Sequence, residues 1–423
     1  MLRVSPENDR VLHEVVETLA PLDRTPCSEG ERRAAEWLAA RLEAIDGVEA
    51  RLEDEPSWGS FPPTATLIGL TGLAAAVASA RGRRGAGALL ACACAAGLVD
   101  EAQNGPRLLR RAIRRRRSTV NVVAHAGDRD ADETLVVIAH HDAPQTGKLF
   151  DQTLQRRIWE RHPERLAHAK RSVPQWWLGL ASPLGALTSS LTCRRGPARV
   201  GLALGALATA LVADVWRSET VPGANDNLSG VAALVALGEL LAAERPDGLR
   251  VLLVSCGAEE TLQDGIRAFV ARHGSHLPPE RTTFVNVDTI GSPHLIMLEG
   301  EGPIWMERYT GSWLREELAE SAAALDIPLE RGFLVRSSTD SVIPSRAGYP
   351  TATLVSITDW RAPANYHLPT DVPENLDYGT VADAVRLLHE VVRRLAARRS
   401  SAGDVRTADS ADGADACEPA LSS

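Results

Sequence analysis

The sequence predicts an α/β fold, in which a three-layer α/β/α domain with a central mixed, largely parallel sheet carries two inserted apolar helical hairpins. Three observations lead to this prediction. Apolar strand-like runs alternate with helical runs along most of the chain. Histidine and acidic residues follow several of the strand-like runs. Four long runs without a charged residue interrupt the alternation.

Five short apolar runs are typical of buried strands. They are Thr119–Ala124, Thr134–Ala139, Leu249–Ser255, Thr283–Val287 and Thr351–Ser356. Three longer runs have the length and periodicity of helices, and these are Leu228–Ala243, Trp313–Ala324 and Val381–Ala397. Alternation of this kind favours a sheet that is parallel at its centre and covered by helices.

The N-terminal part begins with two predicted helices. Residues 8–20 and 29–45 carry apolar side chains at helical spacing, and Ser28 is a suitable N-cap for the second helix. A short strand is predicted near Val48–Leu52. The first 30 residues lack a basic start followed by an apolar core, so we expect no cleavable signal peptide.

The four uncharged runs predict two helical hairpins joined by basic turns. The runs are Ser57–Ala80, Gly85–Val99, Ser172–Cys193 and Val200–Ala213, and the turns are Arg81–Arg84 and Arg194–Arg199. Because a helix needs about 20 apolar residues to cross a bilayer, the first and third runs are long enough and the other two are short. All four runs are rich in Ala and Gly, which weakens membrane insertion relative to Leu-rich helices.

Small and aromatic residues favour a lipid bilayer as the partner of these hairpins. Gly201 and Gly205 have the G-x-x-x-G spacing that permits close packing of helices. Tryptophans lie near the bases of the hairpins, where an interfacial aromatic belt is expected, and they are Trp58, Trp176, Trp177 and Trp216. The alternative is a soluble helical lid that is buried against the main domain.

Basic residues predict the orientation of the main domain. Segments 107–117 and 156–171 hold 13 Lys and Arg residues, whereas the two hairpin turns hold six. By the positive-inside rule, the main domain of this membrane-associated protein is expected to face the cytoplasm. The six cysteines show neither C-x-x-C pairing nor disulfide-scaffold density, which agrees with a reducing compartment.

These features divide the chain into a discontinuous main domain, two insertions and a tail. The main domain comprises residues 1–56, 118–147 and 220–398, the hairpin insertions comprise 57–117 and 148–219, and the predicted disordered tail comprises 399–423. The tail is rich in Ala, Asp and Ser and contains few apolar side chains.

The overall charge bears on the class of partner. The net charge of −9 argues against a nucleic-acid partner, which would require a basic face. The sequence carries no signal that specifies an oligomeric state.

Histidine and acidic side chains follow the predicted strands or lie on loops beside them. His140, Glu260 and Asp288 come at the ends of strands, Asp226 precedes a helix, and His367 follows the last strand. Ligands of open α/β sheets bind beyond the carboxyl ends of strands, so these side chains are expected to converge. Two imidazoles and several carboxylates suit zinc, and one shared carboxylate would hold two ions about 3.5–4 Å apart.

Each of these residues has a simpler explanation when it is considered alone. A His-His-Asp sequence after a strand is more often a polar loop, and the Glu259–Glu260 pair would usually be a solvated helix start. Asp288 alone could cap a helix, and His367 alone could be a surface imidazole. Their joint placement at strand ends favours the metal site. Hydrolysis also needs a carboxylate that takes a proton from water and returns it to the leaving amine, and Glu259 is placed for that task.

Five motifs resemble those of the di-zinc aminopeptidase-type metallopeptidases of clan MH, which include glutamate carboxypeptidase, glutaminyl cyclase and the inactive transferrin receptor ectodomain. The family pattern is H-x-D, G-A-x-D-N-x-S-G, G-A-E-E, N-x-D and Y-H-x-P-x-D. The corresponding segments are His140–Asp142, Gly223–Gly230, Gly257–Glu260, Asn286–Asp288 and Tyr366–Asp371. The resemblance covers roughly 8–56, 118–147 and 220–398, and it leaves both hairpins outside.

The resemblance implies a metal-binding role for five residues. His140 and Asp288 would ligate one zinc ion, and Glu260 and His367 would ligate the other. Asp226 would bridge the two ions. The implied cofactor is therefore a pair of Zn²⁺ ions.

The resemblance also implies two catalytic roles. Glu259 would act as general base and then as general acid, and Asp142 would hydrogen-bond His140 and fix its ring. The family usually follows G-A-E-E with x-G-L-x-G-S, whereas Leu262 and Ile266 replace the Gly and Ser here. This departure affects the neighbouring loop and the substrate pocket rather than the metal ligands.

The favoured hypothesis is a membrane-anchored, zinc-dependent exopeptidase that removes N-terminal residues from a peptide substrate. A carboxypeptidase, another amide hydrolase or a glutaminyl cyclase-like enzyme on the same scaffold is the first alternative, because the sequence does not separate amino- from carboxypeptidase action. A non-catalytic membrane module is the second alternative. Inactive relatives typically lose ligands, whereas all five ligands are present here.

Overall fold

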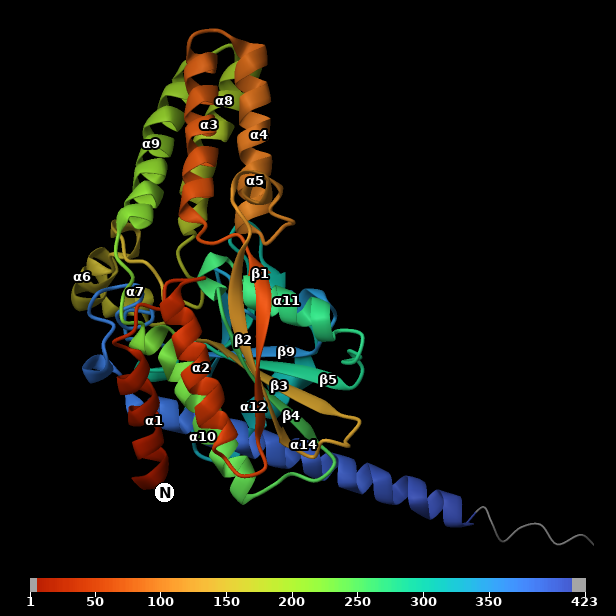
Figure 1. Ribbon diagram of the computed structural model, residues 1–423. Helices are drawn as coiled ribbons and strands as arrows, with labels where there is room; N and C mark the ends of the chain where they lie inside the picture. The colour runs from red at the N-terminus through yellow and green to blue at the C-terminus, as the bar shows by residue number, and fades with distance from the viewer. Residues whose placement is uncertain (1–5, 413–423) are drawn as a thin grey trace, which may run out of the picture.

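A mixed β-sheet forms the centre of the molecule (Figure 1). The computed structural model describes residues 6–412. In this part of the chain the strands follow the order β1-β2-β4-β3-β5-β9-β6-β7, and β8 pairs with β6. The strands are β1 (Glu49–Ser57), β2 (Arg117–Gly127), β3 (Thr134–His140), β4 (Arg250–Cys256), β5 (Thr282–Val287), β6 (His294–Glu301), β7 (Glu307–Arg308), β8 (Glu330–Val335) and β9 (Thr351–Ile357).

The sheet is parallel only in part, which corrects the prediction of a largely parallel sheet. Strands β4, β3, β5 and β9 run parallel to one another at the centre. The outer strands pair in antiparallel fashion: β1 with β2, β2 with β4, β6 with β9, and β7 with β6. Strand β8 runs parallel to β6. Each of the five predicted strand-like runs lies in a strand. The outer strand β1 was predicted too short, because polar and exposed side chains along it hide the strand pattern.

Helices cover both faces of the sheet. One face packs against α1 (Pro6–Leu19), α2 (Glu29–Glu43), α10 (Ser229–Ala243), α12 (Ser312–Ala324) and α14 (Tyr378–Asp412). The opposite face packs against α11 (Asp264–His273) and α13 (Val342–Arg346). Successive side chains of a strand point to opposite faces, so Val137 joins the first core and Val136 joins the second. This arrangement gives the fold a helical layer on each side of the sheet.

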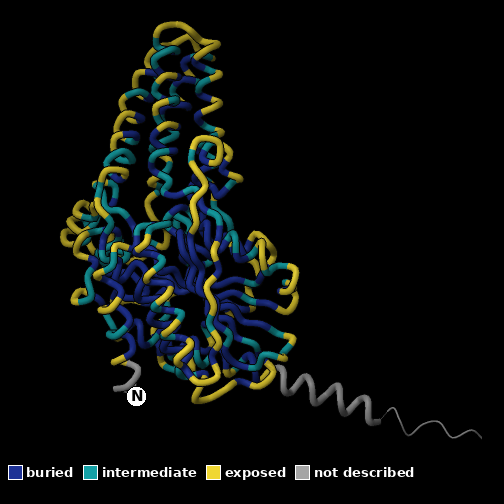
Figure 2. The backbone as a smooth tube through the Cα atoms, in the orientation of Figure 1, coloured by how far each residue is buried: buried dark blue, intermediate teal, exposed yellow. Residues whose placement is uncertain are grey.

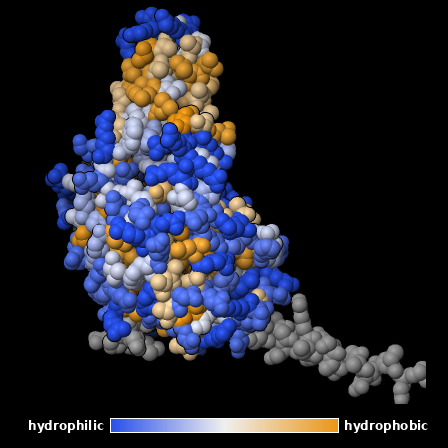
Figure 3. All heavy atoms as spheres, viewed as in Figure 1, coloured by the Kyte–Doolittle hydropathy of each residue, from blue (hydrophilic) through white to orange (hydrophobic). Residues whose placement is uncertain are grey.

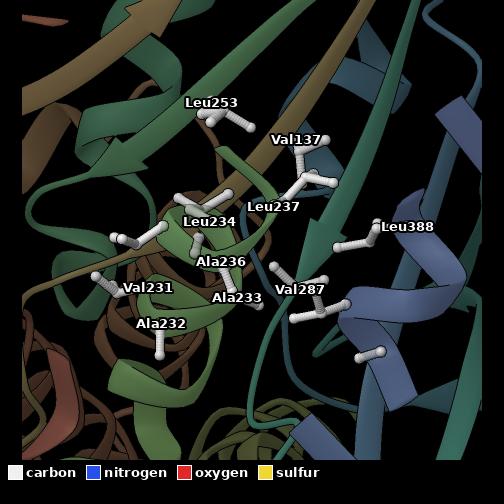
Figure 4. Close-up of a cluster of buried hydrophobic side chains, with 14 of the residues drawn as sticks. Val137, Val231, Ala232, Ala233, Leu234, Ala236, Leu237, Leu253, Val287 and Leu388 are labelled. Atoms are coloured by element: carbon white, nitrogen blue, oxygen red, sulfur yellow. The ribbon is translucent and has the colours of Figure 1, made fainter. Parts of the chain in front are cut away.

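The larger core surrounds α10, which is buried along almost its whole length (Figure 4). Leu234 and Leu237 of this helix lie among side chains of the central strands, including Val137 and Val287. On the far side, Leu388 of α14 approaches the same cluster. Burial of an aliphatic side chain of this kind contributes roughly 1.5–3 kcal/mol, so α10 fixes the strands and the loops at their ends.

The four apolar runs form one helical bundle that projects from the sheet domain (Figure 1). Its helices are α3 (Pro62–Ala80), α4 (Arg84–Ala102), α8 (Ala181–Thr192) and α9 (Gly196–Arg217). Helix α3 packs against each of the other three, and α8 does the same. A Cβ atom on Gly205 would lie 1.6 Å from Ser182 Oγ, so glycine allows α8 and α9 to approach closely.

The lengths of the bundle helices differ from the prediction. The third run contains the shortest helix, because α8 begins only at Ala181 and the preceding turn, Gln175–Leu180, is a 3-10 helix. Pro183 explains this start, since proline is tolerated in the first turn of a helix but not in its interior. The fourth run is longer than predicted, because α9 continues through Asp214 to Arg217. A count of uncharged residues therefore misplaces both helices.

Many residues along the bundle are exposed or only partly buried (Figure 2), and its surface shows an apolar band below a polar tip (Figure 3). Exposed members include Leu70, Leu89, Leu184, Leu191 and Val200. By length and composition, α3, α4 and α9 could each cross a membrane. A fourth apolar segment, Ala224–Ala243, also qualifies, but 78% of it is buried, so it belongs to the core of the sheet domain.

Two arginines of segment 107–117 do not contribute to a basic surface, which corrects part of the orientation argument. Arg107 and Arg110 are among the largest fully buried side chains. Arg107 forms an ion pair with Asp264, and Arg110 forms one with Glu101. Arg110 also donates a hydrogen bond to the backbone carbonyl of Thr261. These contacts join the short helix α5 (Leu108–Ile113), at the base of the bundle, to the loop after β4.

Two short helices lie outside the sheet and the bundle, and the last helix runs past its predicted end. Helices α6 (Thr153–Arg161) and α7 (Pro163–Leu166) precede the second pair of bundle helices. Helix α14 continues to Asp412, so it does not end at the boundary of 399 predicted for the tail. The last part of that predicted tail, 413–423, lies outside the described residues.

Candidate metal centre

The predicted ligands converge at the carboxyl ends of the parallel strands. His140 is the last residue of β3, Glu260 follows β4, and Asp288 follows β5 directly. Asp226 lies in the segment Ala224–Leu228 that leads into α10, and His367 lies on the loop after β9. Parallel strands end at the same edge of a sheet, so the topology brings all five side chains to one place.

Their donor atoms form two overlapping groups. His140, Asp226 and Asp288 make one group, and Asp226, Glu260 and His367 make the other, with the donor atoms of each group within 4.8 Å of one another. Oδ1 of Asp226 lies 3.3 Å from Nε2 of His140, and Oδ2 lies 3.2 Å from Nε2 of His367. A carboxylate that faces one imidazole with each oxygen has the geometry of a bridge between two cations.

Glu259 lies beside the first of these groups. The carboxylates of Glu259 and Glu260 and the ring of His140 form a third group, whose donor atoms lie within 4.8 Å of one another. Nε2 of Gln263 donates a hydrogen bond of 2.6 Å to Oε1 of Glu259. The same nitrogen donates to the backbone carbonyl of Ser338 at 3.0 Å. Gln263 therefore holds the Glu259 carboxylate, a contact that the sequence analysis did not predict.

Asp142 connects two of the strand ends. Its carboxylate accepts hydrogen bonds from the backbone N–H groups of Glu259 and Glu260, both at 3.0 Å. Oδ1 of Asp142 also lies 3.4 Å from Nδ1 of His140. The side chain thus sets the position of the loop after β4 and faces the ring nitrogen of His140 that points away from Asp226.

The loop that carries Asp226 is fixed by buried hydrogen bonds. The carboxylate of Asp371 accepts from the backbone N–H of Asn225 at 2.7 Å and from that of Asp226 at 3.1 Å. Asn227 donates from its side chain to the backbone carbonyl of Val287 at 2.9 Å, next to Asp288. These contacts hold the shared carboxylate against the end of β5.

The ring of His367 is held by aromatic contacts. The centroid of Phe150 lies 4.1 Å from that of His367, and the centroid of Tyr366 lies 4.0 Å from it. The Phe150 contact was not predicted, because Phe150 comes from a distant turn outside the predicted motifs.

The electrostatics of the cluster suit a divalent cation. Burial raises the pKa of Asp288 to about 7, and burial together with repulsion from neighbouring acids raises the pKa values of Glu259 and Glu260 well above their usual range. Burial opposes ionisation of Asp226 as well, but its hydrogen bonds to His140 and His367 lower its pKa. Crowded buried carboxylates of this kind are stabilised when positive charge lies among them.

The donor set also fits zinc by its chemistry. Imidazole nitrogens and carboxylate oxygens are ordinary zinc ligands, and each group offers one imidazole with carboxylates. Asp340, to which the sequence analysis assigned no role, is buried nearby, and burial raises its pKa to about 8. It adds another acid to the wall of the cluster.

A buried arginine supports the loops around the site. The guanidinium of Arg24 donates to the backbone carbonyl of His141 at 2.9 Å, of Leu19 at 2.6 Å and of Pro222 at 2.6 Å. The side chain is fully buried, and it connects the end of β3 with the segment before Asp226. The sequence offered no pattern that would identify this residue.

We expect Arg24→Ala to destabilise the protein by about 3 kcal/mol or more, because several buried carbonyl groups would lose their donor. Thermal unfolding of the zinc-loaded protein would measure the change. Arg33→Ala is the matched control, since Arg33 is exposed and its loss should change stability by less than about 0.5 kcal/mol. Equal unfolding midpoints for the two variants would contradict a supporting role of Arg24.

One part of the chain matches the profile of a known family. Residues 211–392, which include four of the five candidate ligands, match the profile described as peptidase family M28. A search of curated proteins by sequence found no match.

Solved structures share the fold. A Zn-dependent exopeptidase from Parabacteroides distasonis is 14% identical with a TM-score of 0.52, and the alignment covers 92% of this chain and 99% of that chain. A glutaminyl cyclase from Bacteroides thetaiotaomicron is 13% identical with a TM-score of 0.51, and the alignment covers 91% of this chain and 97% of that chain. The Legionella pneumophila LapA aminopeptidase is 11% identical with a TM-score of 0.51, and the alignment covers 94% of this chain and 76% of that chain. The profile match over residues 211–392 supports the resemblance to peptidase family M28 that the motifs show, and the solved structures share the fold of the chain.

Proposed function

We propose that the protein is a two-zinc exopeptidase, with aminopeptidase action on peptides as the favoured reaction. The observation that carries this proposal is the position of Asp226, whose two carboxylate oxygens each face a different imidazole. His140 and Asp288 would hold one ion, and Glu260 and His367 would hold the other. Asp226 would bind both ions. When bound, the zinc ions would polarise the scissile carbonyl and lower the pKa of the attacking water.

The residues of this chain would supply the proton transfers. Glu259, beside both candidate ion sites, would take the proton from the attacking water and return it to the nitrogen of the leaving amine. Gln263 would keep the Glu259 carboxylate oriented through its 2.6 Å hydrogen bond. Asp142 would fix the ring of His140 and the loop that carries Glu259.

A peptide-library digest tests the reaction. The zinc-loaded protein is expected to shorten peptides from the N-terminus, a chelator should abolish the activity, and added zinc should restore it. Mass spectrometry of the products identifies which end is trimmed. Trimming from the C-terminus would replace the aminopeptidase proposal by a carboxypeptidase, and digestion that persists in chelator would contradict the metal mechanism.

We also propose that the bundle anchors the protein in a membrane, with the sheet domain on the cytoplasmic side. The exposed apolar side chains of the bundle support insertion, and its tip carries the basic turns. The exposed arginines that remain near the sheet domain, including Arg111, Arg115 and Arg116, support the orientation.

Cell fractionation tests the membrane anchor. The protein is expected in the membrane fraction, and detergent but not high salt should release it, because the contact is apolar rather than electrostatic. Recovery in the soluble fraction without detergent would show that the bundle is a lid instead.

A further inference from the structure

An apolar cavity leads from the candidate metal centre into the helical bundle. Glu260 and His367 line its lower end. Above them, the wall consists of side chains from the bundle, among them Ala65, Ala208 and Val212. The cavity is therefore continuous with the place where an amide would react.

The cavity is deeper than one amino-acid side chain. Its wall extends from Phe61, the N-cap of α3, to Gly69 of that helix, and eight steps of a helix correspond to about 12 Å at 1.5 Å per residue. An extended peptide would need about three residues to reach that depth, since each residue spans about 3.3–3.6 Å.

The hydroxyl hydrogen atoms of the bundle part are already used as hydrogen-bond donors. Two hydroxyl groups line it, and Ser182 Oγ donates to the backbone carbonyl of Gly201 at 3.1 Å. Thr209 Oγ1 donates to the backbone carbonyl of Gly205 at 2.8 Å. A peptide in this space would leave its backbone N–H and C=O groups without partners, at a cost of several kcal/mol, whereas a hydrocarbon chain would lose nothing.

A second cavity, which also borders the metal centre, has a different character. His140 and Asp288 line it, and so do Arg171 and Arg336. Arg171 is exposed, and the guanidinium of Arg336 stacks over Trp177 at 5.0 Å and donates only a long contact of 3.4 Å to the Ile304 carbonyl. Asp151 also lines this cavity, but its carboxylate accepts the backbone N–H of Thr153. The two guanidinium groups of Arg171 and Arg336 outnumber the single charge of Asp151, and a guanidinium group suits a carboxylate.

From these two cavities we infer that the substrate is an N-acyl amino acid whose acyl chain enters the bundle and whose carboxylate faces Arg336. The inference rests on the proposed two-zinc amide hydrolysis and adds to the peptide reaction a second class of amide, in which an acyl group takes the place of the N-terminal residue. Water adds across the amide, the C–N bond breaks, the carbonyl carbon keeps the water oxygen as a fatty acid, and the nitrogen leaves as the free amine of the amino acid. The bundle would place the acyl chain at the level of the bilayer, where hydrocarbon chains partition.

Chain length provides the first test. The full-length, zinc-loaded protein in detergent is assayed with N-acetyl, N-octanoyl and N-dodecanoyl forms of one amino acid. We expect kcat/KM to rise by at least about tenfold from acetyl to dodecanoyl, because each methylene that leaves water favours binding by about fourfold. Equal values for the three substrates would overturn the inference.

Two variants of α9 locate the acyl chain. Ala208→Phe places a ring in the cavity and is expected to reduce the dodecanoyl-to-acetyl ratio of kcat/KM by about tenfold. Ala206→Phe, on the exposed side of the same helix, should leave the ratio unchanged. Zinc content and thermal unfolding show whether both variants fold. A ratio that is the same in both folded variants would overturn the placement of the chain.

A third variant tests the carboxylate. The wild type is expected to prefer the N-dodecanoyl amino acid over its carboxamide by about tenfold, and Arg336→Gln should remove this preference. The peptide digest separates this inference from the proposed function. Zinc-dependent peptide hydrolysis without any preference for acyl chains would overturn only the inference, whereas loss of hydrolysis of every amide by the zinc-loaded protein would overturn both.

Discussion

Replacement of Glu259 by glutamine is expected to lower kcat for zinc-dependent hydrolysis by at least about a hundredfold and to leave the zinc content unchanged. Glutamine has nearly the shape of glutamate but can neither take a proton from water nor return it to the leaving amine. The amide oxygen of the new side chain can still accept the hydrogen bond from Gln263, so the local packing should persist. Steady-state kinetics and zinc analysis on the same preparation measure both quantities.

The matched control for this prediction is Glu36→Gln. Glu36 is an exposed residue of α2 that belongs to neither group of candidate ligands, and its replacement removes the same charge. Wild-type kinetics are expected for this variant. If Glu259→Gln kept wild-type kcat while it bound zinc normally, another group would be the base.

The positions of the candidate ligands were predictable because they follow strands that stand out by their apolar residues. Strand β3 ends in His140, and β5 is followed by Asp288, so parallel topology alone places these side chains at one edge of the sheet. The groups that hold the ligands were not predictable in the same way. Gln263 joins Glu259, four residues away, to the distant backbone carbonyl of Ser338, and Arg24 donates to the distant backbone carbonyl of His141. No residue pattern marks such contacts with distant carbonyl groups.

The insertions show a second limit of sequence patterns. Charge-free runs indicated the bundle but not the ends of its helices. Pro183 sets the true start of α8, and α9 continues past the charged Asp214 to Arg217. Basic residues were counted as a surface property, although Arg107 and Arg110 are buried against Asp264 and Glu101. Hydropathy and charge counts do not show which acidic partner the fold supplies, and for that reason they overestimate the basic surface.

The cavity in the bundle could not be predicted at all. It arises because small residues of α3 and α9, such as Ala65 and Ala208, face one another above the metal centre. Helical spacing is the same whether small side chains close a helix interface or leave a space beside it. Only the packed arrangement of the bundle on the sheet domain distinguishes these cases.

Loss of the shared carboxylate is expected to have the largest effect on the metal centre. Asp226→Asn should reduce the bound zinc from about two ions per chain to fewer than one, whereas Asp288→Asn should leave about one. The difference follows from the geometry, because Asp226 faces both His140 and His367, while Asp288 belongs to only one group of donors. Elemental analysis after dialysis against a weak chelator measures the stoichiometry.

Asp46→Asn is the matched control, since Asp46 is exposed and its replacement should leave about two ions bound. Equal zinc contents in Asp226→Asn and Asp288→Asn would contradict a bridge. In that case each imidazole would hold its own ion with separate carboxylates, and the 3.3 Å and 3.2 Å contacts of Asp226 would reflect only ion pairing with the two rings. The ratio of the two stoichiometries therefore distinguishes a coupled pair of ions from two independent sites, and general-base catalysis by Glu259 at a paired centre requires the former.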